Sequence, residues 1–279
     1  MASDGYPSPQ LTSEQLAAAI AEPPAAGEWK LYWDAVPPPS QAALLTLSCL
    51  PELQARVRLV RVNVMRSQQL EPEFRALCPL HEVPVLQEPD GTLLTESRAI
   101  MVYLAELGGP AGATLYPASA RGRAACHRWM LFDVTCLYPR LKEYHLPVML
   151  GRAGRPNSAA LPAVDEALSA LNAELQRHSY VTGDALTVAD LGLAVTVAQV
   201  RAVGVDLSPY TAVAAWYERL RRQLPGLRQA ERGSAEYAET LRQIMDDWDR
   251  RQSGTERGGG DGHQVDGGRE CQGEEAEES

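Results

Sequence analysis

The chain has 279 residues, of which 45% are hydrophobic, and it carries a formal net charge of −10. This length allows a full hydrophobic core and one or two domains. The negative charge argues against a nucleic-acid surface, which needs a basic stripe. No apolar run approaches the roughly twenty residues of a membrane-spanning helix, so we expect no membrane contact.

The N-terminal residues and the cysteines indicate in which cellular compartment the protein lies. Asp4 and scattered prolines stand where a signal peptide would have a basic and then an apolar stretch. The five cysteines are odd in number and have neither CxxC nor metal-ligand spacing. We therefore expect a cytoplasmic protein with structural thiols and no metal site.

The first elements have the pattern of a small α/β domain. Residues 1–28 form an extension, expected to be partly disordered, with one short helical pattern at 13–21 that either docks or hangs free. A strand at 29–33, a helix at 40–50 and an alternating strand at 57–64 follow. Strand, helix and parallel strand together predict a right-handed crossover unit.

A hairpin and a helix complete this domain. After a short helix at 71–77, apolar runs at 83–87 and 92–95 are joined by the turn 88–91. Pro84 has no N–H for a sheet ladder, so the backbone of its predecessor is left to pair with a ligand. The helix that follows begins with polar residues, and its first turn favours a carboxylate. The same residues also suit an ordinary helix cap.

The rest of the chain has helical periodicity. A Gly- and Pro-rich stretch at 108–117 is typical of a linker. Residues 121–149 predict one long helical region, bent or broken at Pro139 and Pro147. Thr187, followed three positions on by an aspartate, has the form of a capping box at the start of a core helix. Four further helices are predicted at 163–177, 187–203, 212–223 and 235–251.

These patterns divide the chain into five segments. The last segment is rich in glycine, and eight acidic residues stand against two arginines from Thr255 onward. Such a composition predicts a disordered acidic tail. The predicted segments are the extension 1–28, the α/β domain 29–107, the linker 108–117, the all-α domain 118–251 and the tail 252–279.

Two groups of motifs resemble one known family. HEVPVL, DGTLLTESRAIMVYL and LYP are similar to the glutathione-binding half of the cytosolic glutathione transferases, and FDVTCLYPRLKEY and LTVADLGLAVT are similar to their helical half. The resemblance runs from about Lys30 to about Gln243 and is strongest to the arthropod delta and epsilon classes. It implies a thioredoxin-like N-terminal domain (βαβαββα) followed by an all-α helical-bundle domain. It also implies a homodimer that conjugates glutathione to hydrophobic electrophiles in detoxification.

The resemblance also implies how glutathione is held. Gln69 and His81 would meet its glycyl end, with Gln69 where the delta class usually has another histidine. Val83 would pair its backbone with the cysteinyl residue, beside a cis Pro84. His81 is equally consistent with a surface loop.

The γ-glutamyl end of glutathione would lie at the helix that follows. There Glu96 and Ser97 would hold its amine and carboxylate, and Arg98 would add positive charge. The second ligand, a hydrophobic small molecule, is expected between the domains. Each residue of the implied apolar set also suits the core: Val36, Leu131, Thr135, Tyr138 and Leu141.

The residue that would activate the thiol is not matched. In the delta and epsilon classes a serine after the first strand does this, and an ungapped comparison puts Pro37 in its place. The tyrosine of other classes would fall on Trp33, with Tyr32 pointing to the opposite face of the strand. Ser40 is the nearest substitute, either as the thiolate partner or only as the N-cap of its helix.

Three functions remain open. The first is a glutathione transferase with weakened or relocated thiolate activation. The second is a non-catalytic protein that binds glutathione or a steroid-like ligand, because the last helix loosely resembles an epsilon-like branch linked to ecdysteroid synthesis. Leu141 stands where that branch has an acidic residue, with Glu143 two residues on. The third is a subunit or adaptor whose acidic tail contacts other proteins.

Overall fold

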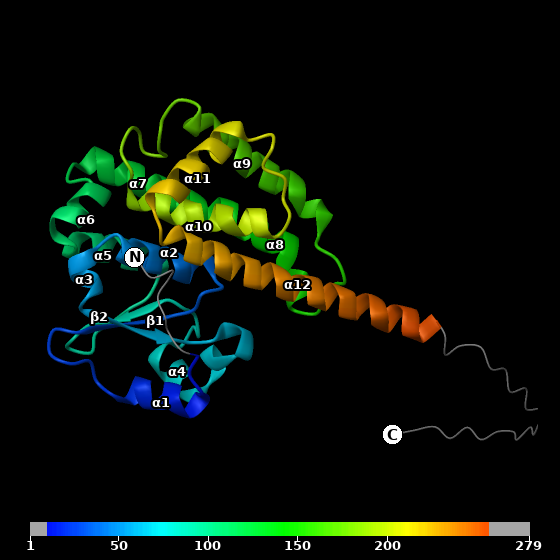
Figure 1. The fold of residues 1–279 in the computed structure, drawn as a ribbon, viewed down its shortest axis with the longest axis horizontal. Helices are drawn as coiled ribbons and strands as arrows, with labels where there is room; N and C mark the ends of the chain where they lie inside the picture. The colour runs from blue at the N-terminus through cyan, green and yellow to red at the C-terminus, as the bar shows by residue number, and fades with distance from the viewer. Residues whose placement is uncertain (1–9, 257–279) are drawn as a thin grey trace, which may run out of the picture.

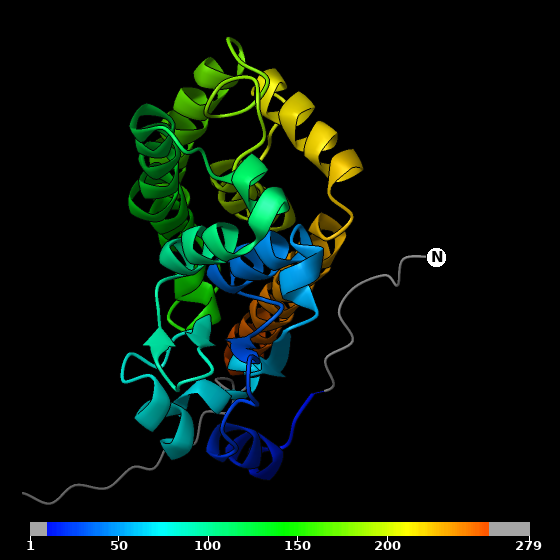
Figure 2. The ribbon, with the colours of Figure 1, turned by 90° about the vertical axis from the view of Figure 1, so that its left-hand side faces the viewer.

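The computed structural model describes residues 10–256, which form two layers (Figures 1 and 2). The N-terminal layer contains a four-stranded mixed sheet in the order β2-β1-β3-β4. β1 and β2 are parallel, and β3 and β4 add antiparallel strands. This arrangement confirms the predicted crossover and hairpin, and a helical domain follows as predicted. The strands are β1 (Trp29–Trp33), β2 (Val57–Arg61), β3 (Val85–Gln87) and β4 (Leu93–Leu94).

Every residue of β1 is buried, because both faces of the sheet are covered. Leu31 and Trp33 belong to the main core, which continues into the helical domain. Tyr32 lies instead in a second, smaller core with Leu16 and Phe74. The alternation of a strand therefore separates Tyr32 from Trp33, as predicted.

The N-terminal extension is docked where the structure describes it. Helix α1 (Ser13–Ala21) begins with a capping box between Thr12 and Gln15 and buries Leu16 completely. Lys30 of β1 donates from Nζ to the carbonyl of Ala19, at 2.7 Å, and to the carbonyl of Glu22 at the end of this helix. The helix predicted at 13–21 is therefore docked, which is one of the two alternatives that the sequence left open, and residues 1–9 lie outside the described residues.

Turns and short helices connect the strands of this layer. β2 ends at residue 61 and not at 64, because the Asn63 side chain accepts the N–H of Arg66 and starts a 3-10 turn. The elements between β1 and the end of the domain are α2 (Pro38–Ser48), α3 (Pro51–Gln54), η1 (Val64–Arg66), η2 (Gln68–Leu70), α4 (Pro72–Leu77) and α5 (Ser97–Leu107).

The stretch predicted as a linker at 108–117 contains a helix. α6 (Gly109–Leu115) packs against α5 at Gly112, where a Cβ would lie 1.8 Å from the carbonyl oxygen of Ala105. Glycine therefore serves here as a contact between two helices. The glycine and proline content of residues 108–117 is also typical of an unstructured linker, so composition alone did not predict this helix.

The helical domain begins with a π-helical junction. Pro139 has no N–H for the carbonyl of Thr135, and the N–H of Tyr138 bonds to the carbonyl of Asp133, five residues earlier. Pro147, by contrast, lies inside a continuous helix. The elements are α7 (Ala120–Phe132), η3 (Asp133–Leu137), α8 (Tyr138–Met149), η4 (Ser158–Ala160), α9 (Leu161–Leu175), α10 (Val188–Ala202), α11 (Thr211–Gln223) and α12 (Leu227–Glu256).

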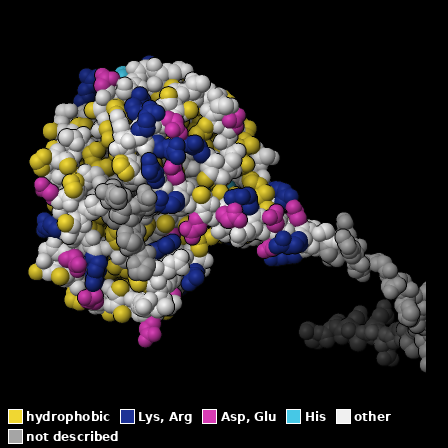
Figure 3. Space-filling model, in the orientation of Figure 1, with side chains coloured by type: hydrophobic (Ala, Val, Ile, Leu, Met, Phe, Trp, Pro, Cys, Tyr) yellow, Lys and Arg dark blue, Asp and Glu magenta, His cyan; other side chains and the backbone are white. Residues whose placement is uncertain are grey.

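Helix α12 is longer than predicted at both ends. It begins at Leu227, crosses the base of the helical layer and extends beyond it (Figure 1). The predicted disordered tail is helical as far as Glu256, and the remainder lies outside the described residues. Basic and acidic side chains are interspersed along its projecting end (Figure 3). Among the described helices, none is both long and apolar enough to cross a membrane.

Helix α10 forms the centre of the helical domain. Thr187 and Asp190 make the predicted capping box. Asp190, which is 0% exposed, accepts the N–H groups of Thr187 and Val181 and the indole N–H of Trp216, at 2.9–3.0 Å. One carboxylate thus joins the start of α10, the preceding loop and α11.

The Asp190→Ala variant should lower the free energy of unfolding by about 3 kcal/mol, because it leaves several buried donors without an acceptor. Urea titration would measure the change. Asp184 is exposed in the same loop, so Asp184→Ala is the matched control and should change stability little. Equal losses in the two variants would contradict this role for Asp190.

Candidate functional site

A cleft of about 650 Å³ lies between the two layers. The sheet domain contributes the turn before β3, the segment after β2 and the start of α5, and the helical domain contributes one face of α8. Six of the seven residues predicted to bind glutathione line this cleft: Gln69, His81, Val83, Pro84, Glu96 and Ser97.

The segment that precedes β3 has free backbone groups at the cleft. The Val83–Pro84 peptide bond is cis, as the resemblance implied. Val83 lies before the first paired residue of β3, and within residues 10–256 it makes no backbone hydrogen bond. Its N–H and C=O are therefore available to an extended ligand, in the manner of an added strand.

The first turn of α5 forms a second part of the same wall. Glu96 precedes the helix with φ of 67° and makes no side-chain capping bond. A positive φ at a non-glycine residue is strained and is found most often at functional sites. Ser97 is the first residue of this 11-residue helix, whose initial N–H groups have no partner within the helix. The turn therefore has donors for a carboxylate.

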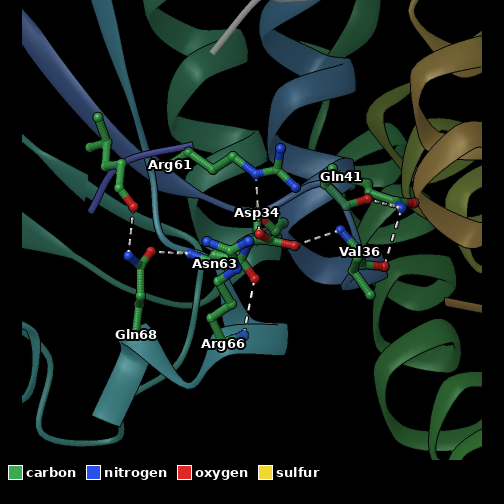
Figure 4. Close-up of polar contacts among 10 residues, drawn as sticks. Asp34, Val36, Gln41, Arg61, Asn63, Arg66 and Gln68 are labelled. Carbon is green, nitrogen blue, oxygen red and sulfur yellow. Dashed lines mark hydrogen bonds and ion pairs between the residues drawn. The ribbon is translucent and has the colours of Figure 1, made fainter. Parts of the chain in front are cut away.

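Gln69 comes from the segment after β2. Gln68 holds this segment by accepting the N–H of Asn63 at 2.8 Å and donating to the carbonyl of Leu11 at 2.8 Å (Figure 4). The side-chain oxygen of Gln69 is buried at the cleft and has no hydrogen-bond partner among the described residues. A buried acceptor without a partner is uncommon and fits a ligand with a donor group.

Arg98 does not line the cleft, contrary to the prediction. Its guanidinium turns to Asp133 of the π-helical turn and forms an ion pair with it, with side-chain exposures of 11% and 0%. Arg98 faces a second, apolar groove of about 500 Å³ on the other side of α5. The charge of Arg98 therefore stabilises the contact between the two domains and does not face the candidate ligand site.

The loop between β1 and α2 is held by a polar network (Figure 4). Asp34 accepts the N–H of Val36 at 2.8 Å and pairs with Arg61 at 3.4 Å. Gln41 donates from its side chain to the carbonyls of Ala35 and Val36, at 2.5 and 3.2 Å. Burial raises the pKa of Asp34, and the Val36 N–H and Arg61 oppose that rise. This network fixes the path of the chain into Pro37.

Both predicted roles of Ser40 are wrong. Ser40 is 0% exposed and is absent from the cleft lining. Its hydroxyl accepts the N–H of Asp34 at 2.8 Å, which closes the loop from inside. The N-cap of α2 is Pro37, and Ser40 is the third residue of the helix. Pro37 itself lines the cleft, with Pro39.

Of the predicted hydrophobic-ligand residues, only Tyr138 lines the cleft. Val36 and Leu141 are buried in the core, Leu131 lines the groove beyond α5, and Thr135 is exposed. The cleft wall consists instead of residues on one face of α8 and its C-cap. Their four-residue spacing was visible in the sequence: Tyr138, Lys142, Leu146 and Leu150.

Two family models match the chain. The model of the glutathione S-transferase N-terminal domain covers residues 31–106, and that of the C-terminal domain covers residues 156–219. Glutathione S-transferase D7 of Anopheles gambiae is 34% identical over 197 residues, which are 70% of this chain and 87% of that relative. The chain belongs to the glutathione S-transferase family.

Solved structures agree with this assignment. A delta-class glutathione transferase of Nilaparvata lugens is 31% identical with a TM-score of 0.71, over 77% of this chain and 99% of that one. A glutathione transferase homologue of Drosophila mojavensis with bound glutathione is 28% identical with a TM-score of 0.69, over 78% and 97% of the two chains. The family and fold implied by the motifs are therefore confirmed.

This glutathione S-transferase buries a histidine behind its cleft. His145 of α8 is 2% exposed, and its Nδ1 lies 2.6 Å from the hydroxyl of Tyr237 on α12. Burial, with a smaller effect of Lys142, lowers the pKa of His145 to about 4. His145 is therefore neutral at pH 7 and joins α8 to α12 through a neutral hydrogen bond.

We predict that the free energy of unfolding falls as the pH drops from about 6.5 to about 4. In this range His145 is protonated in the unfolded chain but stays neutral in the folded protein. The shift corresponds to about 3 kcal/mol across this window. Urea titrations between pH 7 and pH 4 would show this slope, and His145→Asn should flatten it. Tyr237→Phe should keep the slope, because burial causes the shift; an unchanged slope in His145→Asn would contradict the prediction.

Proposed function

We propose that this glutathione S-transferase conjugates glutathione to hydrophobic electrophiles in the interdomain cleft. The observation that carries the proposal is one wall with both the free backbone of Val83 and the first turn of α5. Val83 would pair with the cysteinyl residue of glutathione, and Glu96 and Ser97 would hold its γ-glutamyl amine and carboxylate. Gln69 and His81 would meet the glycyl end.

Calorimetric titration with glutathione tests this proposal. Binding in two buffers of different ionisation enthalpy also reports proton release from the thiol. Ser97→Ala should weaken binding by about tenfold, because a hydrogen bond to a charged group is lost. Ser158 is an exposed serine outside the cleft, so Ser158→Ala should bind like the wild type. If glutathione does not bind the wild type, the proposal fails.

The activation of the thiol is the step for which the cleft is least equipped. Pro37, at the serine position of the family comparison, has neither a hydroxyl nor an N–H. Pro38 and Pro39 are the first two residues of α2, so its N-terminus also lacks two of the usual free donors. We propose that bound glutathione keeps a thiol pKa close to that of a free thiol, about 8.5.

Pro37→Ser should therefore raise kcat/KM at pH 6.5 at least about tenfold, because it adds one donor to the developing thiolate. The apparent pKa of the pH–rate profile should fall at the same time. Steady-state conjugation of 1-chloro-2,4-dinitrobenzene between pH 6 and pH 9 measures both. Pro37→Ala removes the ring without adding a hydroxyl and is the matched control; an equal gain in both variants would show that the hydroxyl is not responsible.

A non-catalytic ligand-binding role is the second candidate, and the three prolines at this position favour it. Glu143, unlike the buried Leu141, lines the cleft and offers a carboxylate to a steroid-like hydroxyl. Turnover and steroid binding separate the candidates. Glutathione binding without turnover, together with saturable steroid binding, would support this role over conjugation.

The groove beyond α5 supports the homodimer that the family resemblance implies. It is lined by apolar residues of α5 and α7, with Leu131 58% exposed. We propose that a second copy of the chain covers it, because an exposed apolar surface of this kind is unfavourable in a monomer.

Leu131→Asp should shift the protein toward monomer, because it places a charge in the apolar interface. Sedimentation velocity at micromolar concentration would report the change. Leu150 is 52% exposed outside this groove, so Leu150→Asp controls for the loss of an exposed leucine. A monomeric wild type, or a dimer unaffected by Leu131→Asp, would overturn the proposed interface.

We also place the protein in the cytoplasm. Burial raises the pKa of the Cys49 and Cys126 thiols, which suits structural cysteines. All four cysteines within the described residues are free, as expected in a reducing compartment: Cys49, Cys78, Cys126 and Cys136.

A further inference from the structure

The helical wall of the cleft carries two cations that have no acidic partner among residues 10–256. Lys142 of α8 lies with Nζ 5.6 Å from the ring centre of Tyr138. Within the described residues it makes no ion pair, and neither does Arg152 of the loop after α8. Most other arginines on this side are paired, such as Arg140 with Glu166 and Arg155 with Asp249.

Both cations line the cleft beside an apolar stripe. Val134, Leu146 and Leu150 line the same wall. An apolar body with one anionic end would cover the stripe and place its charge near the cations. Glu143 also lines this wall, so the wall carries two positive charges and one negative charge.

The loop that carries Arg152 is anchored at several points. The N–H of Arg152 bonds to the carbonyl of Pro147 at 2.8 Å. Two residues on, Gly154 packs against Trp248 of α12, where a Cβ would lie 2.2 Å from the indole ring. Arg155 then pairs with Asp249 of α12 at 2.6 Å. The backbone at Arg152 is therefore held to α8, and the residues that follow it are held to α12.

The other acidic residues of the cleft belong to the opposite wall. Glu82 and Glu96 come from the sheet domain, next to Val83 and Ser97. Under the proposed function Glu96 binds the amine of glutathione. The excess of positive charge therefore lies on the helical wall of the cleft, opposite the residues proposed to bind glutathione.

We propose that the preferred second substrate is an electrophile with an apolar body and an anionic group, which Lys142 and Arg152 bind. This inference rests on the proposed function, because it assigns the substrate class of the same cleft. With an aryl chloride, the glutathione sulfur forms a bond to the ring carbon and chloride leaves with the bonding electrons of the C–Cl bond. The thiol proton passes to solvent.

A pair of matched electrophiles tests the inference. 4-Chloro-3-nitrobenzoate and 4-chloro-3-nitrobenzamide share the leaving group and the ring, and they differ in charge. Their glutathione conjugates, S-(4-carboxy-2-nitrophenyl)glutathione and S-(4-carbamoyl-2-nitrophenyl)glutathione, allow binding to be measured without turnover. Calorimetry with both conjugates and steady-state rates with both electrophiles, corrected for the uncatalysed rates, give two independent readouts.

We expect the carboxylate conjugate to bind about tenfold more tightly than the carbamoyl conjugate, with about threefold from each cation. Lys142→Met and Arg152→Gln should each lower this ratio by about threefold, and added salt should lower it in the wild type. Arg222 is exposed on α11 outside the cleft, so Arg222→Gln is the control and should keep the ratio.

The possible outcomes separate this inference from the proposed function. Equal binding of the two conjugates, or a preference that both cleft variants retain, overturns the inference. A preference of the expected size with no turnover of either electrophile supports the anionic ligand class and overturns conjugation. If neither conjugate binds, both proposals fail.

Discussion

The ion pair between Arg98 and Asp133 is the contact on which the arrangement of the two layers depends. Asp133 is fully buried in the π-helical turn, and Arg98 is the second residue of α5. A Cβ at Gly192 of α10 would lie 3.1 Å from the guanidinium. Burial raises the pKa of Asp133, and the guanidinium opposes that rise. Because neither charge is tolerated alone at this depth, the three segments are held in one position.

The ion pair also lies between two surface features, the cleft on one side of α5 and the apolar groove on the other. Ser97 faces the cleft, and the next residue, Arg98, lines the apolar groove. The first turn of α5 can offer its free N–H groups to a ligand because the side chain behind it is fixed to the other domain. The ion pair between Arg98 and Asp133 therefore stabilises both the candidate ligand site and the proposed dimer surface.

The loop after β1 keeps its conformation without a serine at position 37. Asp34, Ser40 and Gln41 hold the loop through hydrogen bonds that do not involve the Pro37 side chain. The one contact to Pro37 in this set is from the N–H of Gln41 to its carbonyl, at 3.1 Å, which any residue would provide. Gly233 of α12 packs against the same loop, where a Cβ would lie 1.7 Å from the Ala35 carbonyl oxygen. The site keeps its shape with proline at position 37, because its architecture does not depend on a hydroxyl there.

Local chemistry in the sequence determined the elements and the wall of the cleft that the sheet domain provides. Strand alternation, the capping box and the segment from Val83 to Ser97 depend on neighbours in the chain, and the structure has them as predicted. Only the tertiary structure decided where Ser40 and Arg98 point and which face of α8 lines the cleft. Ser40 pairs with Asp34 and Arg98 pairs with Asp133 because these groups are buried together in the packed fold. A buried polar group without a partner is costly, and no local sequence pattern predicts which groups are buried.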